Sequence, residues 1–244
     1  FGSVIHDTLE EFFEGMIDND KKFPSKDELM KMLEGQMYSQ RAKFSIEGYK
    51  LKKEYGEQTL GGMYDKFIDT WCKEVKLEEH VSAVVDGIKI KGFIDKVEFH
   101  QYDIQFIDYK TGDREGIYAK DKLKKPNPKG RTEKAKMGGD YWRQAVFYKI
   151  LADESQKYLL PVNKAKYVFV EPDKESKQIP DPVEFTFTLD DISLVKTQIK
   201  ETYASIMNHE FYEGCGKADC QYCNFMQDTG QDISVAELQE DVSL

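Results

Sequence analysis

The fold of this chain is decided by two segments, Gly92-Phe93-Ile94-Asp95-Lys96-Val97 and Ile107-Asp108-Tyr109-Lys110-Thr111-Gly112. Both alternate between apolar and polar residues with the period of two that is typical of β-strands. Asp95 shares a strand face with apolar neighbours, and so do Asp108 and Lys110. A charge on an apolar face needs a partner, because removing an unpaired ion from water costs several kcal/mol. The pattern therefore predicts charged groups that contact one another on neighbouring strands.

A divalent cation would relieve the repulsion between two carboxylates if the strands bring Asp95 beside Asp108. Two carboxylates and a strand carbonyl form a hard oxygen site that suits Mg²⁺ or Mn²⁺. Lys110 could orient or deprotonate a metal-bound water, or offset the charge that develops at a phosphate. The alternative is a buried Asp–Lys ion pair with a purely structural role. The spacing of the residues alone leaves both interpretations open.

The 244 residues are 40% hydrophobic and 33% charged, which is typical of a globular chain with a sizeable core. The apolar runs are short, so we expect no membrane partner, and the N-terminus does not resemble a signal peptide. Because the chain begins with Phe1 and not with Met, we expect it to be a fragment of a longer protein.

The net charge is −10, which argues against a protein that coats duplex DNA. Residues 119–136 depart from this average, because they carry eight basic and two acidic side chains. The basic residues are Lys120, Lys122, Lys124, Lys125, Lys129, Arg131, Lys134 and Lys136. This segment could bind a polyanion locally, although a solvated loop explains the same pattern.

Hydrophobic periodicity predicts an α/β fold with an N-terminal helical region. Apolar spacing predicts a helix over residues 1–18, Ser25 and Glu28 form a capping box before a second helix, and a third helix ends near Trp71. The pattern then changes to a period of two, and Asp86-Gly87 is typical of a hairpin turn. We expect strands at residues 81–85, 88–99, 104–110, 165–171 and 183–189, and helices at 141–153 and after Thr188.

Three of the four cysteines lie close together, at Cys215, Cys220 and Cys223. A secreted protein would distribute its cysteines to join loops, whereas this clustering is typical of a metal site and a reducing compartment. We therefore expect a cytoplasmic protein. Cys72 borders the apolar face of a predicted helix, so we interpret it as a core residue. Residues 226–244 carry five acids and no base, which predicts a disordered tail.

Five motifs, in their order along the chain, resemble the RecB-like and AddB-like exonuclease domains of the PD-(D/E)XK nucleases. They are Gly2-Ser3-Val4-Ile5-His6, the two strand segments quoted above, Gln144-Ala145-Val146-Phe147-Tyr148, and the three clustered cysteines. The resemblance covers nearly the whole chain. It implies a single domain over residues 1–225, which begins with a helical part at 1–78. The core at 79–189 would be restriction-endonuclease-like, with helices that flank a central mixed sheet. A C-terminal helix with the cysteine motif would follow at 190–225.

The resemblance also implies roles for individual residues. The metal ligands would be His6, Asp95, Asp108 and the carbonyl of Tyr109, and Lys110 would be the catalytic lysine. A further acid of the family falls on Glu79 or Glu78, and we prefer Glu79. Gln144 and Tyr148 lie four residues apart on one helix face, so they could reach the scissile phosphate or support Lys110; the polar side of an amphipathic helix is the alternative. Lys96 stands where the family commonly has Arg.

The function implied is metal-dependent hydrolysis of DNA by an exonuclease module that is joined to, or bound by, a helicase in recombination and repair. The basic residues from Lys120 to Arg131 would border the cleft and hold DNA phosphates. Family members with an iron–sulfur cluster use a fourth, upstream cysteine, so we expect an iron–sulfur cluster or Zn²⁺ only in the full-length protein. Two alternatives remain: a catalytically silent module of the same fold that binds DNA or a helicase, and a cysteine-metal module with the sheet as a scaffold.

Overall fold

The structure of the chain is a computed structural model that describes residues 1–112, 117–131, 133–210, 221 and 224. It comprises two compact units, residues 1–195 and residues 196–244. The first unit contains the whole sheet and the helices that flank it, and all the contacts described below lie within it. Helix α7 (Leu189–Met207) extends from the first unit into the second. Among the described residues, no helix is both long enough and apolar enough to cross a lipid bilayer.

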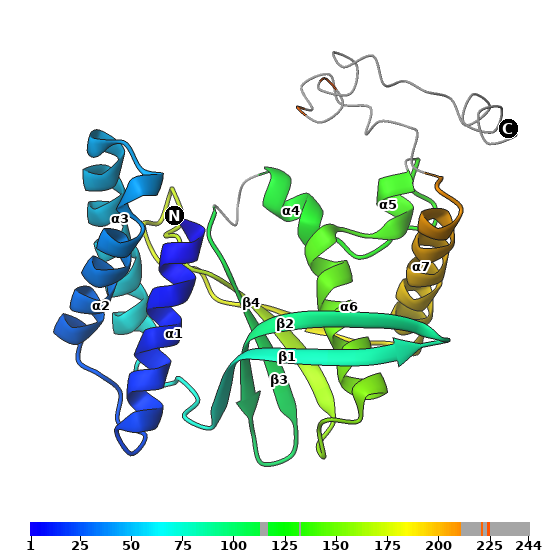
Figure 1. Cartoon of the computed structure of the whole chain (residues 1–244), viewed down its shortest axis with the longest axis horizontal. Helices are drawn as coiled ribbons and strands as arrows, with labels where there is room; N and C mark the ends of the chain where they lie inside the picture. Colours follow the sequence, from blue (N-terminus) through cyan, green and yellow to red (C-terminus); the bar gives the residue numbers. More distant parts are fainter. Residues whose placement is uncertain (113–116, 132, 211–220, 222–223, 225–244) are drawn as a thin grey trace, which may run out of the picture. The chain divides into compact units, whose positions relative to one another are not determined.

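A five-stranded mixed sheet forms the centre of the first unit (Figure 1). The strands lie in the order β1-β2-β3-β4-β5, and only the β3–β4 pair is parallel. Their bounds are β1 Val75–Val85, β2 Ile88–Phe99, β3 Ile104–Lys110, β4 Val162–Phe169 and β5 Val183–Thr186. A parallel pair needs a long crossover connection, which here contains helix α6 (Asp140–Ser155). The predicted α/β fold with a mixed sheet is confirmed.

The hairpin between β1 and β2 turns at Asp86-Gly87, as the sequence predicts. Both residues have positive φ, 48° and 84°, which is the conformation that a two-residue hairpin turn requires. Strand β1 begins at Val75, six residues before the predicted start. In its first half, partly buried side chains alternate with exposed ones. This segment therefore has fewer apolar residues than a strand that is buried on one face, and the sequence pattern did not identify it.

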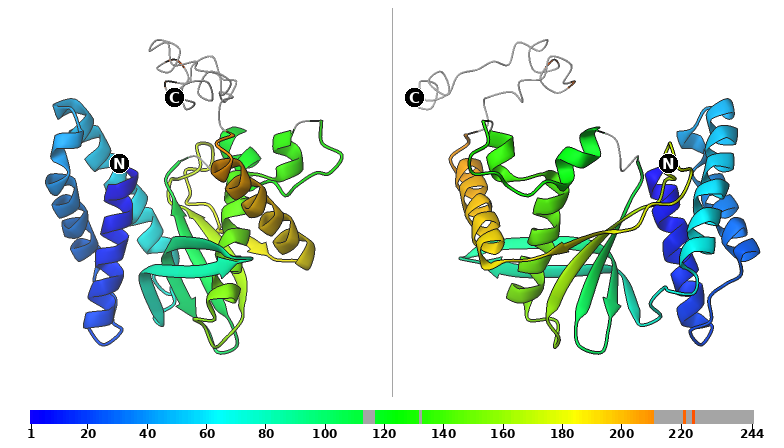
Figure 2. Two further views of the ribbon diagram at one scale, coloured as in Figure 1. Left: turned by 45° about the vertical axis from the view of Figure 1, so that its right-hand side comes forward. Right: turned by 180° about the vertical axis from the view of Figure 1, so that it is seen from behind.

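Three N-terminal helices pack beside the sheet (Figure 2). They are α1 (Gly2–Asp18), α2 (Lys26–Ser39) and α3 (Ile46–Phe67), and a 3-10 turn at Arg41–Lys43 precedes α3. The capping box predicted at Ser25 is present, since its side chain accepts a hydrogen bond from the Glu28 N–H and the Glu28 carboxylate accepts one from Ser25. The predicted apolar stripe of α1, which includes Phe12 and Phe13, is fully buried.

Strand β3 has different neighbours on its two faces, which positions the polar residues. Ile107 and Tyr109 belong to the core cluster that includes α1 and α2. Phe106 and Asp108 alternate with them and contact Tyr148 of α6. The N-terminal helices therefore cover one face of β3, and α6 covers the other.

The basic segment contains two short helices, α4 (Ile117–Leu123) and α5 (Glu133–Met137), where the sequence predicts a loop. Hydrogen bonds between backbone groups connect this segment to the start of α6, because the Gly139 N–H donates to the carbonyl of Lys124. A Cβ at Gly139 would lie 2.2 Å from the carbonyl oxygen of Lys122. Only glycine therefore allows this close approach of the segment to α6.

Candidate active site

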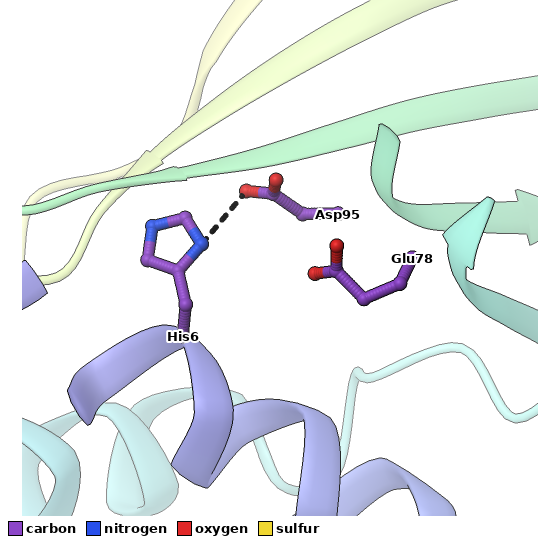
Figure 3. Close-up of side chains that lie close together, drawn as sticks. All are labelled: His6, Glu78 and Asp95. Carbon is purple, nitrogen blue, oxygen red and sulfur yellow. Dashed lines mark ion pairs between the residues drawn. The ribbon is translucent and has the colours of Figure 1, made fainter. Parts of the chain in front are cut away.

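Three potential metal ligands converge from three different elements (Figure 3). They are His6 of α1, Glu78 of β1 and Asp95 of β2, and their ligand atoms all lie within 4.8 Å of one another. The Nδ1 atom of His6 lies 3.4 Å from Oδ2 of Asp95. The buried residues of α1 fix this arrangement, because Leu9 and Phe13 hold the helix against the sheet and line the same small pocket.

Asp95 occupies the first position beyond the pairing of β2 with β3. The ladder between these strands ends at Lys96 and Ile107. The N–H of Tyr109 then donates a hydrogen bond to Oδ2 of Asp95, at 2.8 Å. The end of the ladder therefore supplies a backbone donor that orients the carboxylate of Asp95 toward the site.

The acid beside His6 and Asp95 is Glu78, and the preference for Glu79 does not match this geometry. Glu79 instead forms an ion pair with Lys157, 2.7 Å away. The cause is local: Glu78 has φ +42°, a left-handed conformation that interrupts the simple alternation of side chains along β1. Burial, and then the negative charge of Asp95, raise the pKa of Glu78 above its usual range.

Asp108 is buried on the α6 side of β3, with only 6% of its side chain exposed. Its Oδ2 atom lies 2.5 Å from Nζ of Lys110, and its Oδ1 atom accepts a hydrogen bond from the Tyr148 hydroxyl at 3.3 Å. Burial raises the pKa of Asp108 to about 6, and the charge of Asp95 contributes in the same direction. The two aspartates are therefore close enough to repel each other.

Gln144 connects these groups into a closed ring of polar contacts. Its Oε1 atom accepts hydrogen bonds from Nζ of Lys110 and from the Tyr167 hydroxyl, both at 3.1 Å. Its Nε2 atom donates to the Tyr148 hydroxyl at 2.8 Å. Burial raises the pKa of both tyrosines, so they remain protonated hydrogen-bond donors. Together with the Asp108 contacts, the ring fixes the direction of the Lys110 ammonium group.

These donors fit a divalent cation. The cluster offers two carboxylates, whose oxygens suit Mg²⁺ or Mn²⁺, and an imidazole nitrogen, which is a ligand typical of transition metals. Burial, and after it the negative charge of Asp95, raise the pKa of Asp108, while the charge of Lys110 acts in the opposite direction. A cation bound beside Asp95 would favour the charged form of both carboxylates.

A sequence model of the PD-(D/E)XK nuclease superfamily matches residues 1–227. The chain belongs to this superfamily. Among solved structures, it is similar to a "putative exonuclease" from Eubacterium rectale, with 15% identity, a TM-score of 0.50, and coverage of 87% of this chain and 80% of that one. At this identity, the likeness supports the fold alone. The structure of SSO0001 is also similar, with 18% identity, a TM-score of 0.33, and coverage of 73% and 65%. No curated protein matches the chain.

Within this PD-(D/E)XK fold, the basic segment reaches the site through Tyr141 of α6. The Nζ atoms of Lys110 and Lys122 lie 4.9 and 5.0 Å from the centre of the Tyr141 ring. Lys124 and Lys125 form ion pairs with Asp121 and Asp191, and the other predicted DNA-binding residues, Lys120, Lys129 and Arg131, are exposed. Among the predicted DNA-binding residues, Lys122 is therefore the one that the described contacts connect, through Tyr141, to Lys110.

Sequence reasoning missed the aromatic surroundings of Lys110. Tyr141 and Tyr167 place their rings within about 5 Å of its ammonium group, at 4.9 and 5.2 Å. The position of Tyr141, three residues before Gln144 on the same helix, was a usable signal, whereas Tyr167 lies on β4 and could not be assigned without the strand order.

The thiol of Cys72 is partly buried, and burial raises its pKa. Cys215, Cys220 and Cys223 lie outside the described residues.

Proposed function

We propose that this PD-(D/E)XK chain is a divalent-metal-dependent deoxyribonuclease that acts as an exonuclease. The observation that carries the proposal is the continuity between two groups of side chains. The His6–Glu78–Asp95 cluster is joined, through the Tyr109 N–H, to the strand that carries Asp108 and Lys110. Of the two aspartates, Asp95 thus belongs to the potential metal cluster, and Asp108 contacts the ammonium group of Lys110. This arrangement suits hydrolysis of a phosphodiester.

The residues that would hold the cation are His6, Glu78, Asp95, Asp108 and the carbonyl of Tyr109. When bound, Mg²⁺ or Mn²⁺ supplies a more acidic water and neutralises charge on the phosphate. Lys110 offers its ammonium group to the phosphate oxygens, where negative charge develops during attack. Gln144 and Tyr148 are positioning residues in this scheme, because they hydrogen-bond to Lys110 and Asp108.

We further propose that the basic residues of the segment hold DNA phosphates beside the site, through Lys120, Lys122, Lys124, Lys125, Lys129 and Arg131. The contact of Lys122 with Tyr141 supports this reading. A chain with a net charge of −10 has little general affinity for DNA. This balance suits an enzyme that receives DNA from a helicase domain or subunit. In the full-length protein, we propose that Cys215, Cys220 and Cys223 bind an iron–sulfur cluster or Zn²⁺.

The test is digestion of end-labelled single- and double-stranded DNA with Mg²⁺, with Mn²⁺ and with chelator, alongside the Asp108→Ala variant. We expect wild-type cleavage in either metal, loss of cleavage in chelator, and loss in the variant with little change in fold. Shortening from a labelled end would distinguish an exonuclease from an endonuclease. DNA binding without any cleavage in either metal would contradict the proposal and favour a silent module.

A further inference from the structure

One face of the β1–β2 hairpin carries an exposed aromatic pair next to the metal cluster. His80 of β1 and Phe93 of β2 are direct cross-strand partners, and their ring centroids lie 4.9 Å apart. Phe93 is 57% exposed and His80 is also exposed. Phenylalanine is among the residue types that are most often fully buried, and at Phe93 the ring is instead open to contact from a ligand.

The aromatic pair is not part of the core. The opposite face of the hairpin packs on α6, because a Cβ at Gly92 would lie 2.8 Å from Cδ1 of Leu151. On β1, the neighbours of His80 are partly buried (Glu79) and buried (Val81), while His80 itself is exposed. Since successive side chains of a strand point to opposite faces, Phe93 points away from α6.

His80 and Phe93 each lie two residues along their strand from a ligand of the proposed metal site. Phe93 precedes Asp95 by two residues on β2, and His80 follows Glu78 by two residues on β1. Two residues of a strand span roughly 6.6–6.8 Å, which is comparable to the length of one extended nucleotide. A base that stacks on Phe93 would therefore belong to a nucleotide at, or next to, the phosphate in the site.

Two lysines continue the same face away from the site. Lys91 and Lys89 precede Phe93 on β2, by two and four residues, and both are exposed. Neither forms an ion pair with another residue in the part of the chain that the structure describes. We refer to His80, Phe93, Lys91 and Lys89 as the hairpin face. It presents an aromatic ring and then two available cations, in line with the metal cluster.

We propose that the hairpin face binds single-stranded DNA next to the scissile phosphate. One base stacks on Phe93, and the phosphates beyond it contact Lys91 and Lys89. Stacking on an aromatic ring together with phosphate contacts is how proteins hold a single strand without reading its sequence. A duplex cannot use this surface, since the faces of its bases are covered by their neighbours. The inference rests on the proposed nuclease function, and it specifies the form of the substrate.

The test measures binding separately from cleavage. The affinity for a fluorescent oligothymidylate is measured by anisotropy in chelator, for wild type and for Phe93→Ala, Phe93→Leu and Phe93→Trp. We expect about tenfold weaker binding for the Ala and Leu variants, which corresponds to about 1.4 kcal/mol and lies within the range for one base stacked on an aromatic ring. Binding by the Trp variant should be near that of the wild type. Tyr102→Ala is the matched control, because Tyr102 is 76% exposed on the β2–β3 turn and should bind normally. Circular dichroism checks that each variant is folded.

Substitution of the lysines provides a second measurement. Lys91→Ala should lower the slope of log affinity against log salt by about 0.7, the value for one phosphate contact on a single strand. Cleavage in Mg²⁺ is assayed in parallel. Normal binding by Phe93→Ala in an enzyme that cleaves DNA would overturn the hairpin-face proposal and leave the nuclease function intact. Phe93-dependent binding without cleavage would support the hairpin face and contradict the nuclease function.

Discussion

The buried ion pair between Lys96 and Glu98 lies next to Asp95 of the candidate active site, and its removal offers a test of the structure. Lys96 is 1% exposed, its Nζ lies 2.9 Å from Oε1 of Glu98, and it lies 4.0 Å from the centre of the Phe13 ring. Burial acts against the charged form, but contacts with Tyr109 and Glu98 outweigh it and raise the pKa of Lys96. The lysine is therefore charged in the folded protein at neutral pH.

Replacing Lys96 with Met should destabilise the protein by about 3 kcal/mol. Removing one partner of a buried ion pair costs about 3–5 kcal/mol, because the other charge is left without compensation. The lower end applies here, since 10% of the Glu98 side chain is exposed and water can solvate part of its charge. For a unit of this size, about 3 kcal/mol corresponds to a decrease in melting temperature of roughly 6–12 °C.

The assay is thermal unfolding followed by tryptophan fluorescence, in which Trp71 is a local reporter because it lines the cavity beside Lys96. The double variant Lys96→Met/Glu98→Leu should recover most of the lost stability, since neither charge remains buried. Lys96→Arg should be tolerated, because the adjoining cavity of about 200 Å³ leaves space for the guanidinium group. A loss below 1 kcal/mol for Lys96→Met, or a double variant that is no more stable than the single one, would refute the burial argument.

Three further predictions concern the site. Glu78→Gln should reduce Mg²⁺-dependent cleavage at least tenfold, whereas Glu79→Gln should leave it nearly unchanged; comparable losses would show that the cluster geometry is wrong. Gln144→Leu should lower kcat with little change in KM, because it releases the Lys110 ammonium group; an unchanged kcat argues against a positioning role. Mg²⁺ at ten times its Kd should raise the melting temperature of the wild type by roughly 3–6 °C. The melting temperature of Asp95→Asn should rise much less under the same conditions. Equal shifts for the two proteins would show that the cation binds elsewhere.

The sequence predicts those parts of the fold that depend on local signals. The Asp86-Gly87 turn determines the register of the hairpin, and period-two spacing places Asp108 and Lys110 on one face of β3. It could not separate Glu78 from Glu79, because no glycine or other turn residue in the sequence marks the left-handed backbone at Glu78. Nor could it find Tyr167, which reaches Gln144 only through the parallel pairing of β3 with β4. Contacts that depend on which strands lie side by side cannot be predicted from short sequence patterns.

The end of the β2–β3 ladder explains why the chemistry gathers where it does. Up to Lys96 and Ile107, the backbone groups of the two strands bond to each other, so there is no space between them. One residue further, β3 pairs with β4 only, and the Tyr109 N–H bonds to the carboxylate of Asp95. The same interruption therefore leaves Asp95 without a backbone partner on β3 and provides the N–H donor that orients its carboxylate. A variant that extended the pairing past Asp95 would be expected to gain stability and to lose the site.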